Sequence, residues 1–304
     1  MKRKLIKQGE KALTITLPSQ WIKNNNLQPG DEIELVLEEN SVRILTEKAT
    51  PIKEITVNVS GLLPRLADRF MARAYQKGYD KITLKFDNQD LKYAIENKVS
   101  ELIGYEILDV GKDYVEVCAI ASKIDIDFDN MLRKGLLTLL DMAITCHDAW
   151  IKKDKKSLEN IALQDLSVNK FLYYCLRHLN KSAQTMSFGM SILYYLIESL
   201  EDLGDELKVL GKILAIIKPK PDIADIIKKM NEMFRISYEY FYKPEKENAV
   251  RAFLLSKEIS KLIEKSLQTA KYDEIRALIS IDFSTRIIYH ITTMRLDTLK
   301  GFGR

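Results

Sequence analysis

Polar and apolar residues alternate along short stretches near the start of the chain, as they do in half-buried β-strands. Residues 12–17 alternate in this way, and residues 33–37 repeat the pattern. Pro18 follows the first stretch, and its fixed φ suits the first turn of a short helix over residues 19–23. The pattern predicts a small domain at residues 1–48, with four short strands around one short helix.

Strand-like and helix-like patterns alternate through the next segment, residues 52–122. Their order is β-α-β-α-β-β, at residues 55–59, 62–77, 82–86, 90–103, 105–110 and 114–120. Gly111-Lys112-Asp113 separates the last two strands, and a short turn of this kind is typical of a β-hairpin. The order predicts a small α/β domain with an open sheet and its helices on one face.

Helical periodicity dominates the remainder of the chain. From Leu132 onward, apolar residues recur at spacings of three and four, as on the buried face of a helix. The predicted helices span about residues 129–151, 157–179, 183–217, 223–242, 246–270 and 273–299. Pro219 and its neighbours divide them into two groups of three, residues 128–217 and 222–304. We therefore expect a multidomain chain whose all-α part is two tandem three-helix bundles.

The composition restricts the class of protein. Of the 304 residues, 46% are apolar and 30% are charged, so there is enough apolar material for folded cores. No uncharged apolar stretch is long enough to cross a bilayer, and we expect no transmembrane segment. Three cysteines, an odd and sparse set, favour a reducing cytoplasm. Since the sequence has no glycine-rich nucleotide loop and no nucleophile motif, we expect no catalytic residues and no enzymatic activity.

Charge is distributed unevenly near the start of the chain. Residues 1–30 hold six cations and one acid, Glu10, for a net charge of +5, whereas residues 31–50 have a net charge of −4. A cationic surface binds polyanions such as DNA by releasing counterions, so its affinity falls with salt. The alternative is an ordinary basic segment on a soluble domain, because charge alone does not determine function.

The same segment resembles a known family. The stretch from Lys4 to Trp21, with a glycine-containing loop, a strand that ends at Pro18 and a short helix, is followed by Leu27-Gln-Pro-Gly-Asp31 and another strand. This pattern is similar to the AbrB/MazE/SpoVT swapped-hairpin family. The resemblance implies a dimeric β-barrel head formed by exchanged hairpins. It also implies that DNA is a partner, bound by the cationic residues Arg3, Lys4, Lys7, Lys11 and Lys23.

A run of acidic residues lies inside the third predicted helix. At about 100° per residue, Glu198, Glu201, Asp202 and Asp205 fall within one arc, and leucines occupy the opposite side. Bundle packing alone produces a solvated acidic face of this kind. The alternative is a site for a hard metal ion, which these carboxylates would share with acids of a neighbouring helix.

The run from Glu201 to Asp205 also resembles the Glu-Arg-Ile-Gly-Asp motif of PhoU proteins, which consist of two tandem three-helix bundles. The resemblance implies a divalent or iron-type metal ion on the first bundle, held by Glu201, Asp205 and Asp165, with Asn169 in place of one further acid. Residues 60–62 and 77–82 look like the small α/β insert of archaeal-type PhoU regulators that have an AbrB-like head.

Together, these resemblances imply a cytoplasmic, homodimeric, DNA-binding transcriptional regulator of phosphate uptake and homeostasis. The PhoU-like helical body would be coupled to the AbrB-like head. The alternative is a PhoU-type interaction protein that regulates a phosphate transporter or a sensor kinase, with the head used only for dimerisation.

Overall fold

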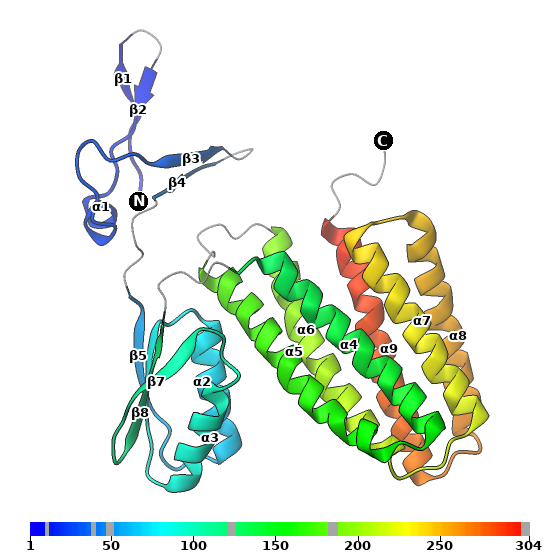
Figure 1. The fold of residues 1–304 in the computed structure, drawn as a ribbon. Helices are drawn as coiled ribbons and strands as arrows, with labels where there is room; N and C mark the ends of the chain where they lie inside the picture. The colour runs from blue at the N-terminus through cyan, green and yellow to red at the C-terminus, as the bar shows by residue number, and fades with distance from the viewer. Residues whose placement is uncertain (10–11, 38–40, 47–51, 121–125, 182–187, 299–304) are drawn as a thin grey trace. The chain divides into compact units, whose positions relative to one another are not determined.

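The computed structural model of the protein describes residues 1–9, 12–37, 41–46, 52–120, 126–181 and 188–298 (Figure 1). The chain divides into two compact units, Met1–Lys53 and Glu54–Arg304. We call the first unit the head and the second unit the body. The predicted end of the first domain, at residue 48, lies outside the described residues and close to this division.

The head contains two β-hairpins and a short helix. Strands β1 (Ile6–Gln8) and β2 (Ala12–Thr14) pair antiparallel, as do β3 (Glu34–Leu37) and β4 (Val42–Leu45), and helix α1 (Ser19–Asn24) lies between the hairpins in the sequence. Each hairpin is a separate two-stranded sheet in the described part of the head. The predicted four strands and one helix are therefore confirmed.

The residues on either side of α1 have conformations that suit their types. Pro18 is extended, with φ −63° and ψ 129°, and its carbonyl oxygen accepts the first helical hydrogen bond from the Ile22 amide at 3.1 Å. Beyond the helix, Gly30 has a φ of +97°, a conformation that side chains with a Cβ rarely adopt. The Asp31 carboxylate then accepts a hydrogen bond from the Gln28 amide, which closes the turn before β3.

The body begins with the expected α/β fold. Its elements are β5 (Glu54–Asn58), α2 (Pro64–Gln76), β6 (Lys81–Lys85), α3 (Gln89–Val99), β7 (Tyr105–Val110) and β8 (Tyr114–Ala119). The sheet order is β5-β6-β8-β7, with β5 and β6 parallel and the other pairs antiparallel. Alternate residues of the central strands, such as Ile82, Leu84, Val115 and Val117, are fully buried. They form one core with α2 and α3, which lie on the same side of the sheet (Figure 1).

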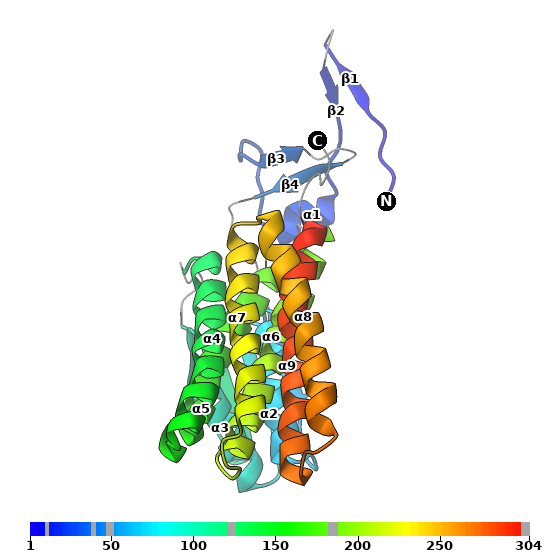
Figure 2. The ribbon, with the colours of Figure 1, turned by 90° about the vertical axis from the view of Figure 1, so that its right-hand side faces the viewer.

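Long helices make up the remainder of the described chain. They are α4 (Phe128–Lys152), α5 (Lys155–Lys181), α6 (Phe188–Leu214), α7 (Pro221–Tyr242), α8 (Lys246–Leu267) and α9 (Tyr272–Thr298). The first three pack together, as do the last three, and α6 against α9 and α4 against α7 join the two groups (Figures 1 and 2). One continuous apolar core runs through both groups. The predicted helix ends at residues 183 and 299 lie outside the described residues.

A buried arginine joins the helices to the α/β fold. Arg177 of α5 is 6% exposed, and its guanidinium donates to Asp80 Oδ1 at 2.6 Å and to the carbonyl oxygens of Tyr75 and Tyr79 at 3.1 and 2.9 Å. The rings of Tyr75 and Tyr105 lie 5.2 and 4.9 Å from the guanidinium carbon. One compact unit therefore contains all three segments that were predicted as separate domains, residues 52–122, 128–217 and 222–304.

We predict that Asp80→Ala lowers the free energy of unfolding of the body by about 3 kcal/mol, because it leaves the buried Arg177 charge without its carboxylate. Urea unfolding followed by circular dichroism measures the change. The matched control is Lys181→Ala, which removes the more exposed partner of the same carboxylate and costs about 0–1 kcal/mol. An equal loss of unfolding free energy in the two variants would show that the buried Arg177–Asp80 pair is not the contact that stabilises the body.

Candidate nucleic-acid interface

The structure describes four of the five cationic residues expected at a DNA surface. Lys7 lies in β1 opposite Leu13, Arg3 and Lys4 lie in the segment before β1, and Lys23 lies in the last turn of α1. Lys11 lies outside the described residues.

These four side chains are exposed, and none of them forms an ion pair with another described residue. Their charges are therefore available to a polyanion. The short segment from Arg3 to Lys7 holds three of them, whereas Lys23 lies on a separate element.

The head has a second unusual feature, which is exposed apolar surface. On one face of the β3–β4 hairpin, Leu35, Leu37 and Val42 are 56%, 78% and 58% exposed. On the β1–β2 hairpin, Ile6 and Leu13 are 55% and 62% exposed. No described head residue whose side-chain burial is given is buried. Since isolated hairpins are marginally stable in water, these faces require a cover.

The acidic run on α6 lies between other elements of the body. Glu198 accepts hydrogen bonds from the Arg73 guanidinium of α2, one of them at 2.9 Å, and Glu201 accepts one from the Tyr173 hydroxyl of α5 at 3.0 Å. Both glutamates are half-buried. The interpretation of a solvated acidic face is therefore wrong for these two residues, because α2 and α5 cover them. The leucines on the opposite side of α6 are buried, as predicted.

Lys208 lies where the resemblance implied a metal ion. Its ammonium donates to Asp165 Oδ2 and to Asp205 Oδ1, each at 2.5 Å, so a side-chain cation already lies between the two carboxylates. Burial raises the pKa of Asp165. Glu201 pairs with Tyr173 instead. Across the described residues, no group of three or more His, Cys, Asp or Glu side chains is arranged to hold a metal ion. The residues present do not fit the implied divalent or iron-type ion.

Burial also perturbs the acids that face α2 and α5. Removal from water raises the pKa of Glu201 above its ordinary value of 4.5, and the Tyr173 hydroxyl and nearby Arg73 oppose the shift. The pKa of Asp202 is raised as well, by burial and by the neighbouring Glu198 and Asp205. These carboxyls therefore hold their protons more strongly in the folded protein than in the unfolded chain.

Comparison with known families supports the interpretation of the head. Residues 6–54 match the family described as "Antidote-toxin recognition MazE, bacterial antitoxin". A comparison of the chain with curated proteins finds no match. The chain therefore contains an N-terminal domain of the MazE/AbrB type, followed by a mostly helical body. Among the described helices, none is both long and apolar enough to cross a membrane.

We predict that Glu201→Gln makes the protein less sensitive to rising pH. Because the folded pKa of Glu201 is raised, the unfolded chain loses its proton first, and stability falls as pH rises from 4.5 through the folded pKa. Glutamine does not ionise and can still accept the Tyr173 hydrogen bond. Urea unfolding from about pH 4 to about pH 7 measures the slope. The control is Glu159→Gln on the exposed side of α5; an equally flat profile there would refute the role of Glu201.

Proposed function

We propose that this protein is a homodimeric, DNA-binding transcriptional regulator. The observation that supports this proposal most directly is the MazE-type domain at residues 6–54, whose exposed cations Lys7 and Lys23 form no ion pair with another described residue. Lys7 and Lys23 lie inside the matched range, and Arg3 and Lys4 lie directly before it. Phosphate groups along DNA neutralise such cations and release counterions, which yields sequence-independent affinity.

In this proposal, a second copy of the head buries the exposed apolar faces of the two hairpins. The two hairpins of one chain do not pair with each other in the described residues, and each leaves large apolar side chains exposed. When two heads interlock, Leu35, Leu37 and Val42 of each copy become buried, and the hairpins form a shared barrel. The dimer also doubles the number of cations that DNA encounters.

The finer part of the proposal is control of phosphate uptake by the body. Its support is the resemblance of the run from Glu201 to Asp205 to PhoU proteins, together with two groups of three helices in the body. In this proposal the body responds to phosphate status and alters the affinity of the head for DNA, which requires two states of the dimer. In the alternative, the body binds a phosphate transporter or a sensor kinase, and the head only dimerises.

We predict that DNA affinity falls steeply with salt and that Lys4→Ala combined with Lys7→Ala weakens it. Each phosphate contact that is lost makes the slope of log affinity against log salt shallower by about 1. Fluorescence anisotropy with a labelled duplex, between about 50 and 200 mM salt, measures the slope.

The matched control for this experiment is Lys155→Ala combined with Lys156→Ala, which removes two exposed charges from the body. Unchanged binding in the head variant, or an equal loss in the body variant, would defeat the DNA assignment. Absence of DNA binding by an intact dimer would favour the interaction-protein alternative.

We further predict that Leu37→Asp converts the protein to a monomer, because it places a charge on the apolar face that dimerisation buries. Sedimentation velocity measures the mass, and circular dichroism checks that the helical body remains folded. Leu163→Asp on α5, where the leucine is 64% exposed, is the control and leaves the dimer intact. A Leu37 variant with unchanged mass would show that the β3–β4 face does not form the dimer contact.

A further inference from the structure

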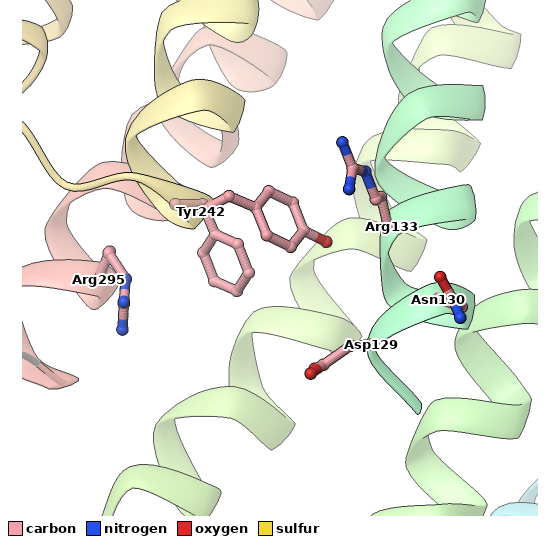
Figure 3. A pocket seen from close by; sticks show the side chains of 6 residues that line it. Asp129, Asn130, Arg133, Tyr242 and Arg295 are labelled. Carbon is pink, nitrogen blue, oxygen red and sulfur yellow. The ribbon is translucent and has the colours of Figure 1, made fainter. Parts of the chain in front are cut away.

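The body contains a hollow of about 390 Å³ between its two groups of helices (Figure 3). It is lined by Asp129, Asn130, Arg133, Phe241, Tyr242 and Arg295. These residues come from the first turns of α4, the last turn of α7 and the last turn of α9. A second hollow of about 360 Å³ lies beside it and shares Arg133 and Tyr242 with it.

Arg133 is oriented by a hydrogen bond and an aromatic ring, and no carboxylate among the described residues pairs with it. Its Nε donates to the Tyr238 hydroxyl at 3.0 Å, and its guanidinium carbon lies 5.4 Å from the centre of the Tyr242 ring. It forms no ion pair with any described acid. The hydrogen bond and the ring fix the orientation of the guanidinium, while its two terminal nitrogens remain available. This arrangement is suited to a bidentate contact with an oxyanion.

A second arginine enters the hollow from the other group of helices. The guanidinium carbon of Arg295 lies 5.9 Å from the centre of the Phe241 ring. Phe241 and Tyr242 contact each other edge to face, with ring centres 5.1 Å apart. Arg133 and Arg295 lie on opposite sides of Tyr242 (Figure 3). Two cations and an aromatic pair thus line one space.

The remaining lining groups select for more than negative charge. Asp129 extends its carboxylate toward the hollow, and it can only accept hydrogen bonds when ionised (Figure 3). Asn130 beside it offers both an acceptor and a donor. A ligand that satisfies all these groups has an oxyanion for the arginines, hydroxyl or amino donors for Asp129, and a planar or apolar part for the aromatic rings.

We propose that this hollow binds a ribonucleoside monophosphate, with the phosphate held by Arg133 and Arg295 and the sugar or base donating to Asp129. The volume lies within the range of about 300–1,000 Å³ that is typical of small-molecule sites. A bare phosphate ion would leave most of the space unfilled. Because Arg133 and Arg295 belong to different helix groups, the bound phosphate would link the two halves of the body. This site does not depend on DNA binding by the head.

Isothermal titration of the full-length protein with AMP, GMP, CMP and UMP, and separately with inorganic phosphate, tests the proposal. We expect at least one nucleotide to bind, and inorganic phosphate to bind at least about tenfold more weakly. Arg133→Gln and Arg295→Gln should each weaken nucleotide binding by roughly tenfold or more, because each removes a charge-assisted hydrogen-bonding group. The control is Arg286→Gln, whose arginine is exposed on α9 and pairs with Asp282 of the same helix.

Circular dichroism establishes that each variant is folded, and the exposed Arg133 provides a test even if the less exposed Arg295 proves structural. Binding of none of the four nucleotides would overturn the proposal. So would unchanged nucleotide affinity in the Arg133 variant, or an equal loss in the Arg286 control. The proposal would also be overturned if inorganic phosphate bound as tightly as the best nucleotide, because the site would then recognise only a simple anion.

Discussion

The arrangement of the body depends on the ion pair between the buried Arg177 guanidinium and Asp80. A charge removed from water is costly unless it is paired and fully hydrogen-bonded, and Asp80 with two backbone carbonyls satisfies this requirement. These partners all lie between the last turn of α2 and the start of β6, so they tie α5 to this one segment of the α/β fold. Tyr173, one turn earlier on α5, extends into the core of the α/β fold. The helices and the sheet are therefore joined by specific polar contacts as well as by apolar packing.

The packing of α2 against α5 also accounts for the pairing of one acid on α6. Because α2 lies beside the helices, Arg73 reaches Glu198, and the two charges pair although both side chains stay partly exposed. Lys208 similarly neutralises Asp165 and Asp205. A lysine ammonium within the same chain supplies the positive charge that a metal ion would otherwise supply. The resemblance to a metal-binding motif and the absence of a suitable ligand set among the described residues are thus compatible, because the acids are retained while their counter-ion is a side chain.

Local patterns were sufficient to predict most elements, whereas contacts between distant segments were not. The order β-α-β-α-β-β and the helix breaks near residues 153 and 219 follow from periodicity, turns and prolines, which are local properties. Arg73 and Glu198 are separated by 125 positions, and no local signal indicates that they meet. The hollow at Arg133 and Arg295 was missed for the same reason. The neighbouring tyrosines of α7 were visible in the sequence, but their position between two arginines depends on how α4 and α9 pack.

The two features of the head act together in its proposed role. Three cations between residues 3 and 7 of one chain give only a few phosphate contacts, and affinity from a few contacts is weak at physiological salt. A dimer presents two such segments to one duplex, and after the first has bound, the second encounters DNA at a high effective concentration. The apolar surface that a single head leaves exposed would therefore, once buried in a dimer, also strengthen DNA binding. Any ligand of the body that changes the stability of the dimer would then change DNA affinity without a direct contact to the cations, since dimerisation and binding are thermodynamically linked.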